Sequence, residues 1–92
     1  MFTCYVIDSD VAVAALSGFI SLVDHITLVG SSESPKGLLP KFIATKPDLI
    51  FIDIELAKQH PTDVIQFSSV STIIITGNCP SYAFEALELN AI

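Results

Sequence analysis

The chain contains no arginine and only four lysines against ten acidic residues, which gives a formal net charge of −6 over 92 residues. A surface that binds nucleic acid needs a basic patch to neutralise phosphates. The absence of such a patch excludes nucleic-acid binding by this chain on its own. Charged residues make up only 15% of the chain, whereas disordered proteins combine high charge with low hydropathy, so disorder is excluded as well.

A basic leader and a long apolar segment are also missing. An aspartate stands at position 8, and the longest apolar runs fall well short of the roughly 20 residues that span a membrane. The two cysteines, Cys4 and Cys79, lie in apolar segments without CxxC spacing, which indicates buried free thiols. We therefore expect a cytoplasmic protein without membrane contact. The mean hydropathy of +0.66 predicts that some apolar surface is left for a partner.

A length of 92 residues suits one domain, 1–92. Short apolar runs are typical of strands buried on both faces of a parallel sheet, and helical spacing between them predicts helices. The expected strands are 4–7, 26–30, 48–53 and 72–76. The expected helices are 11–23 with Asp10 as N-cap, a short one from Leu38 or Leu39 to 45 beside Pro40, 62–69, and 80–89, with a polar loop between Asp53 and Pro61.

Strands that alternate with helices predict an α/β fold with one parallel sheet. Ligand sites of such sheets lie beyond the carboxyl ends of the strands. The polar residues expected to meet at this rim are Asp8, Ser9, Asp10, Asp53, Glu55 and Thr76. Carboxylates gathered there suit Mg²⁺, and a carboxylate beside Mg²⁺ can attack phosphorus while a hydroxyl binds the phosphoryl group. The alternative is that these residues are a helix cap, a turn acid and ordinary solvated charges.

Several segments resemble the receiver domain of bacterial two-component response regulators. They are residues 5–10 (YVIDSD), 48–56 (DLIFIDIEL) and 73–76 (IIIT), and the tail 82–92 is similar to receivers joined to LytTR-type DNA-binding domains. The resemblance covers nearly the whole chain, in order. It implies a flavodoxin-like (βα)4 sheet and a signalling module that is not an enzyme beyond autocatalytic phosphoryl acceptance and hydrolysis.

The resemblance also implies roles for single residues. Asp53 is expected to accept a phosphoryl group from a histidine kinase or a small phosphodonor. Asp8, Asp53 and the backbone carbonyl of Glu55 are the expected Mg²⁺ ligands. Thr76 is expected to be the switch hydroxyl, and Tyr82 to lie in the helix that transmits the signal to a LytTR-type output domain.

The sequence departs from the family pattern in four places. Ser9 stands where the family has a second acid, which predicts weak Mg²⁺ binding. The stretch after residue 75 allows either Thr76 or Gly77 at the switch position. Ala57-Lys58 replaces a frequent Pro-Gly. The chain ends at residue 92, where the family enters its fifth strand with a phosphoryl-binding lysine, and none of the four lysines matches that lysine.

This last departure predicts a receiver fold lacking its fifth βα unit, with strand 72–76 as an open edge. An open apolar edge is prone to pairing, so we expect a truncated piece of a longer regulator or a homodimer through that edge.

Two other functions remain open at this point. One is a degenerate receiver that acts as an interaction or dimerisation module without phosphorylation. The other is a haloacid-dehalogenase-like phosphatase in which Asp8 is the nucleophile and Asp10 the general acid/base, because Asp8-Ser9-Asp10 resembles the Asp-x-Asp motif of those enzymes. The later lysine and acidic-pair motifs of that family are absent.

Overall fold

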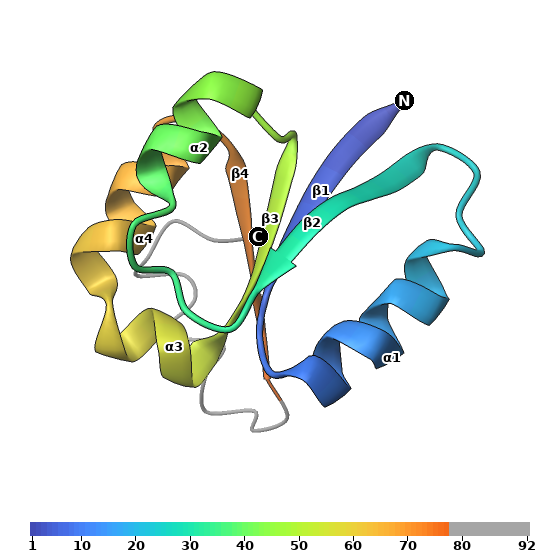
Figure 1. The fold of residues 1–92 in the computed structure, drawn as a ribbon, viewed down its shortest axis with the longest axis horizontal. Coiled ribbons are helices and arrows are strands. Elements are labelled where there is room, and N and C mark those ends of the chain that lie inside the picture. The colour runs from blue at the N-terminus through green and yellow to red at the C-terminus, as the bar shows by residue number, and fades with distance from the viewer. Residues whose placement is uncertain (78–92) are drawn as a thin grey trace.

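A computed structural model describes residues 1–77, which form one four-stranded parallel sheet with helices on both faces (Figure 1). The strand order is β2-β1-β3-β4. In chain order the elements are β1 (Phe2–Ile7), α1 (Asp10–Ile20), β2 (Ile26–Ser32), α2 (Leu39–Thr45), β3 (Leu49–Asp53), α3 (Ile54–Gln59), α4 (Pro61–Ser68) and β4 (Thr72–Thr76). All three strand pairings are parallel, as the alternating pattern predicted.

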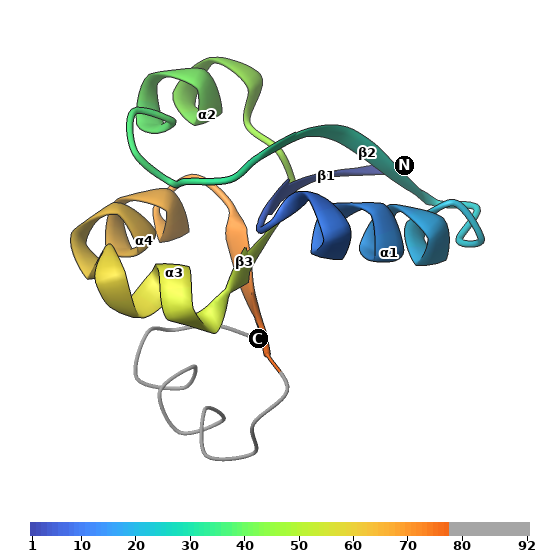
Figure 2. The same cartoon turned by 60° about the horizontal axis from the view of Figure 1, so that its bottom comes forward.

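The helices cover the two faces of the sheet unequally. Helix α1 lies on one side, whereas α2, α3 and α4 lie on the other, as Figures 1 and 2 show. The central strand β1 is buried on both faces: Tyr5 and Ile7 belong to the core under α2, α3 and α4, and Cys4 and Val6 belong to the core under α1. This double burial explains why β1 is a continuous apolar run and not an alternating one.

The larger core is built around three aromatic rings. Phe42 of α2 and Phe67 of α4 are fully buried, with ring centroids 4.8 Å apart, and the Tyr5 ring lies 4.9 Å from that of Phe42. Both pairs meet edge to face, which is a favoured geometry for aromatic rings. These contacts fix α2 and α4 against the sheet.

Helix α1 packs on the smaller core with one side and exposes apolar side chains on the other. Ile20 is buried there, and Val13 and Leu16 pack against the same core. Val11 and Phe19 are 82% and 70% exposed. The described part of the chain therefore keeps an apolar outer surface on α1, in line with its high mean hydropathy.

Cys4 is a buried free thiol in the smaller core, as the sequence predicted. Burial raises the pKa of the Cys4 thiol, which favours its protonated form. Cys79, Tyr82 and the predicted helix 80–89 lie outside the described residues. Within residues 1–77, no helix has the length and apolar character needed to cross a membrane.

Two predicted helix features are wrong. Residues 54–59 form helix α3 and not a polar loop, because the Asp53 side chain caps the segment and Ile54 and Ala57 are buried. The N-cap of α1 is Ser9, while Asp10 is the first helical residue, where its charge still complements the helix dipole.

The remaining helices agree better with the predictions. α1 ends at Ile20, three residues early, because Leu22 and Val23 turn back onto the carbonyls of Phe19 and Ile20. The short helix α2 has its proline in the first turn, and Lys46 ends it with a positive φ of 47°. α4 matches the predicted helix 62–69 within one residue.

Strand β2 runs to Ser32, two residues past its predicted end. The pairing with β1 shifts between Cys4 and Tyr5, where Tyr5 pairs with Gly30 and Val29 becomes the extra residue of a bulge. The bulge places the Tyr5 ring directly over Gly30, and a β-carbon there would lie 2.7 Å from a Tyr5 ring carbon. Glycine is therefore required for the Tyr5 ring to fit.

We predict that Gly30→Ala destabilises the protein by about 1–3 kcal/mol, because the buried Tyr5 ring would have to shift. Gly18→Ala in α1 is the matched control: a β-carbon there meets nothing within 4 Å. That substitution should stabilise the helix by about 0.5–1 kcal/mol. Urea unfolding of both variants measures the two effects, and a Gly30→Ala variant as stable as the native chain would refute the packing account.

Candidate functional site

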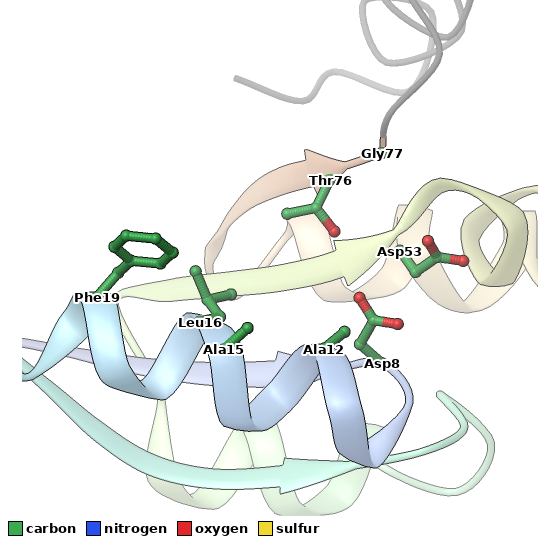
Figure 3. A pocket seen from close by; sticks show the side chains of 8 residues that line it. All are labelled: Asp8, Ala12, Ala15, Leu16, Phe19, Asp53, Thr76 and Gly77. Atoms are coloured by element: carbon green, nitrogen blue, oxygen red, sulfur yellow. The ribbon is translucent and has the colours of Figure 1, made fainter.

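The pairing of β1 with β3 brings two carboxylates to the same rim of the sheet. Ile7 at the end of β1 pairs with Ile52, so Asp8 and Asp53 follow neighbouring strands at the same level. Both side chains line a pocket of about 420 Å³ between α1 and the ends of β3 and β4 (Figure 3). The predicted meeting of these acids is confirmed.

Asp53 ends β3 and caps the helix that follows. Its Oδ2 accepts hydrogen bonds from the backbone N–H groups of Glu55 (3.1 Å) and Leu56 (3.3 Å). Its other oxygen, Oδ1, accepts no hydrogen bond from residues 1–77. One oxygen of this partly buried carboxylate is thus committed to structure, while the other is available for chemistry.

Asp8 has the same division between its two oxygens. Oδ1 accepts a hydrogen bond from the backbone N–H of Ser9 at 2.7 Å, whereas Oδ2 accepts none within the described part of the chain. In Figure 3 the carboxyl groups of Asp8 and Asp53 point into the same space. Two like charges so placed repel each other unless a cation lies between them.

Ser9 lines a neighbouring pocket, but its hydroxyl serves the helix. The Ser9 Oγ accepts a hydrogen bond from the Ala12 N–H at 3.3 Å, which is the capping bond of α1. Because position 9 is a serine and not an acid, the site has one carboxylate fewer. The Ser9 side chain is exposed, so its position at the rim is fixed by its place as the N-cap of α1 and not by burial.

Thr76 ends β4 directly opposite Asp53. The two residues pair across the ladder, and the Thr76 hydroxyl donates to the Ile52 carbonyl at 3.3 Å. Thr76 and Gly77 both line the larger pocket. Both candidates for the switch position, Thr76 and Gly77, therefore lie at the pocket. Of the two, Thr76 is the residue that pairs with Asp53.

A second pocket of about 350 Å³ adds residues that the sequence reasoning did not single out. Asp8, Ser9 and Asp53 line it together with Glu33 and Leu56. Glu33 reaches the rim because β2 continues to Ser32. The polar Ser31-Ser32 pair suggested that the strand stops at Gly30, so a third acid at the rim was missed.

Other predicted or acidic positions stay outside both pockets. Asp10 lies exposed in the first turn of α1 and is absent from both linings. The Glu55 side chain is absent too, and because carbonyls of an α-helix point toward its C-terminal end, the Glu55 carbonyl points away from the Asp53 side chain. Among the described residues that line the two pockets there is no lysine.

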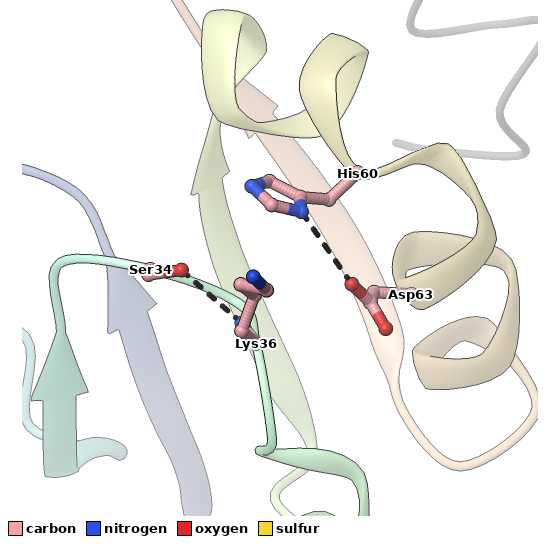
Figure 4. Close-up of polar contacts among 4 residues, drawn as sticks. All are labelled: Ser34, Lys36, His60 and Asp63. Atoms are coloured by element: carbon pink, nitrogen blue, oxygen red, sulfur yellow. Dashed lines mark hydrogen bonds and ion pairs between the residues drawn. The ribbon is translucent and has the colours of Figure 1, made fainter.

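His60 lies at the junction of α3 and α4 and not at the rim. Its Nδ1 is 3.6 Å from Oδ2 of Asp63, one turn along α4 (Figure 4). On the opposing loop, the Lys36 N–H donates to the Ser34 hydroxyl. The contact of His60 is local, and His60 is absent from the linings of both pockets.

The donor set fits Mg²⁺ only sparsely. Mg²⁺ is commonly held by one or two carboxylates, with waters and other oxygens completing the shell. Asp8 and Asp53 each offer one oxygen that accepts no hydrogen bond from residues 1–77. Within the same residues, no group of three or more His, Cys, Asp or Glu side chains is positioned to hold a metal ion. This set favours a weakly held ion.

Comparison with known proteins gives matches among solved structures. The response regulatory domain of mrkE from Klebsiella pneumoniae has a TM-score of 0.73 at 24% identity, covering 98% of this chain and 78% of that one. A DNA-binding response regulator of the LuxR family from Staphylococcus aureus has a TM-score of 0.65 at 11% identity, with 99% and 82% coverage. The signal receiver domain of NarL from Mycobacterium tuberculosis has a TM-score of 0.61 at 17% identity, with 98% and 78% coverage.

The chain has the flavodoxin-like receiver fold. No family model matches it, and a search of curated proteins finds no match either. At these identities the likeness establishes the fold alone, and it confirms the predicted fold class.

We predict that Ser9→Ala destabilises the chain by about 0.5–2 kcal/mol because α1 loses its capping acceptor. Ser9→Asp is the matched control, since aspartate caps a helix about as well as serine. Chemical denaturation of the two variants separates them. Equal stability of Ser9→Ala and the native chain would contradict the capping role of this hydroxyl.

Proposed function

We propose that the chain is a signal receiver that accepts a phosphoryl group on Asp53. The observation that carries the proposal is the difference in hydrogen bonding between the two oxygens of the Asp53 carboxylate. Oδ2 is held by two N–H groups, whereas Oδ1 accepts no hydrogen bond within residues 1–77, and Asp53 lines a pocket together with Asp8 and Thr76. This arrangement occurs at the carboxyl ends of the strands in a receiver fold, where ligands of open α/β sheets bind.

In the proposed reaction, Oδ1 of Asp53 attacks the phosphorus of a phosphohistidine or of a small acyl phosphate. The new bond joins Oδ1 to phosphorus, and the bond from phosphorus to the donor breaks. The donor leaves with the electron pair of that bond, as an imidazole after protonation or as a carboxylate. With acetyl phosphate the total charge is unchanged, since Asp53 becomes an acyl phosphate and acetate is released.

Asp8 and Asp53 are the residues that would hold Mg²⁺ during this reaction. The ion would neutralise charge that develops on the phosphoryl oxygens. Asp8 would then act by keeping the ion beside Oδ1 of Asp53, since both carboxyl groups point into the same space. The proposed ligand role of the Glu55 carbonyl requires a rearrangement at the start of α3, because in this conformation it points away.

Thr76 has the proposed role of binding the phosphoryl group. Its hydroxyl belongs to the residue that pairs with Asp53, and within residues 1–77 it donates to the Ile52 carbonyl alone. A rotation about one side-chain bond would free the hydroxyl to donate toward the pocket.

A histidine kinase is the proposed phosphoryl donor, and an output domain the proposed partner downstream. The receiver fold supports both, and the neighbour from Staphylococcus aureus is a DNA-binding response regulator. A LytTR-type output domain, regulation of transcription and a cytoplasmic location belong to the same proposal. Pairing of two copies along the outer edge of β4 also stays a prediction, because β4 is the last strand of the described sheet on that side.

A phosphorylation-independent interaction module is the second candidate. The capping role of Ser9 and the absence of lysine among the described lining residues both favour it, since they weaken cation and phosphoryl binding. Phosphorylation of the chain itself separates the two candidates.

We predict that incubation with acetyl phosphate and Mg²⁺ adds one phosphoryl group to the chain, and that Asp53→Asn abolishes the adduct. Intact-mass spectrometry measures both. Asp8→Asn should slow the labelling without changing its stoichiometry, because Asp8 holds the ion and does not bond to phosphorus.

Two results would overturn the prediction in different ways. A folded chain that forms no adduct would support the interaction module. An adduct that survives Asp53→Asn but is lost in Asp8→Asn would support the phosphatase-like mechanism, in which Asp8 is the nucleophile.

A further inference from the structure

Helix α1 is apolar around its whole circumference, although only one side of it packs on the sheet. Among residues 11–20 only Ser17 has a polar side chain, and no residue from 11 to 23 is charged. A surface helix normally has a polar face opposite its apolar one, and a helix that is apolar all round is typical of a buried position. In Figures 1 and 2 no described element lies over the outer side of α1. This side therefore has the composition of a contact surface.

The outer side of α1 is formed by a stripe of four residues: Val11, Ala15, Gly18 and Leu22. A helix turns by about 100° per residue, so these four lie within about 60° of one another, and the buried Ile20 lies about 180° from Val11. The two large members of the stripe project into solvent, since Val11 is 82% exposed and Leu22 is 79% exposed. Between them, the stripe residues 15, 18 and 22 line a hollow of about 380 Å³ together with Phe19.

The stripe has the same spacing when it is read from either end. Four residues separate Val11 from Ala15, three separate Ala15 from Gly18, and four separate Gly18 from Leu22. If two such helices pack antiparallel about a two-fold axis, Val11 of one copy lies opposite the partner's Leu22, and Ala15 lies opposite the partner's Gly18. Large side chains then meet at both ends and small ones at the centre, where the helices can approach closely. A two-fold interface requires a surface that is complementary to itself in this way.

The charge of the chain also favours a second copy on this surface. Each copy has a net charge of −6, so two copies repel each other wherever their acidic surfaces meet. The outer side of α1 lets them meet without an acid inside the contact, because Asp10 and Asp24 lie beyond its two ends. A partner that recognises this acidic chain by charge would bind elsewhere.

We infer that two copies of the chain associate through the outer sides of their α1 helices, packed antiparallel. A helix of 11 residues is about 16 Å long, so its outer side offers each partner less than the roughly 800 Å² of a standard interface. The dimer is therefore weak and forms only at high concentration. The inference does not depend on phosphorylation of Asp53, and it uses a different surface from the outer edge of β4.

Sedimentation equilibrium of the 92-residue chain between about 10 μM and about 1 mM tests this inference. The mean mass should rise with concentration from 9.9 kDa toward twice that value. Added NaCl should strengthen the association, because it screens the repulsion between Asp10 and Asp24 at the ends of the contact. In NMR spectra, amide signals of α1 should shift with concentration, and those of α2 and α4 should not.

Substitutions at the two ends of the stripe test the surface and its antiparallel register. Val11→Glu and Leu22→Lys each place an unpaired charge in the contact and should weaken association by about tenfold or more. Ile65→Lys is the matched control, since that side chain is 60% exposed on α4, on the other face of the sheet, and should have no effect. The double variant Val11→Glu with Leu22→Lys brings opposite charges together twice across the two-fold axis, so it should associate more tightly than either single variant.

A chain that stays monomeric at about 1 mM would overturn the inference. If Leu22→Lys then also lowers the midpoint of urea unfolding, the outer side of α1 is covered within the chain itself. A dimer that neither Val11→Glu nor Leu22→Lys weakens would overturn the inference as well, and would point to another surface such as the edge of β4. A double variant that associates no better than the single variants would contradict the antiparallel register.

Discussion

The parallel pairing of β1 with β3 is the constraint on which the rest of the structure depends. Because Ile7 pairs with Ile52, the next residue of each strand, Asp8 and Asp53, must leave the sheet at the same rim. The pairing is secured by burial of β1 on both faces, with Tyr5 in one core and Val6 in the other. The backbone positions of Asp8 and Asp53 cannot separate without disturbing a core, so the fold keeps the two acids at one rim.

The same carboxylate serves structure and chemistry in this chain. Asp53 ends a strand, caps a helix and lines a pocket. Ser9 has a similar double position, at the start of α1 and at the rim of the second pocket, but its hydroxyl is used by the helix. The contrast explains why the site is sparse in metal ligands although three acids, Asp8, Asp53 and Glu33, lie around it.

The sequence predicted the features that follow from long-range pattern and missed those that follow from local geometry. The four strands and the meeting of Asp8 with Asp53 and Thr76 were predictable, because apolar runs and parallel topology determine them. Helix α3 was missed because the segment is short and its helical start depends on the cap from the Asp53 side chain, which the sequence pattern does not reveal. The rim position of Glu33 was missed because β2 continues through the polar Ser31-Ser32 pair, where the sequence predicted its end.

Titration of the chain with Mg²⁺, followed by the backbone amide signals of residues 1–77 in NMR spectra, tests the central claim most directly. We expect saturable shifts confined to the rim, around Asp8, Ser9 and Asp53, with weak affinity. Asp8→Asn should weaken the binding at least tenfold, while Asp10→Asn, at an acid outside both pockets, should leave it unchanged. Shifts spread over the surface, or equal effects of the two substitutions, would contradict a site formed by Asp8 and Asp53.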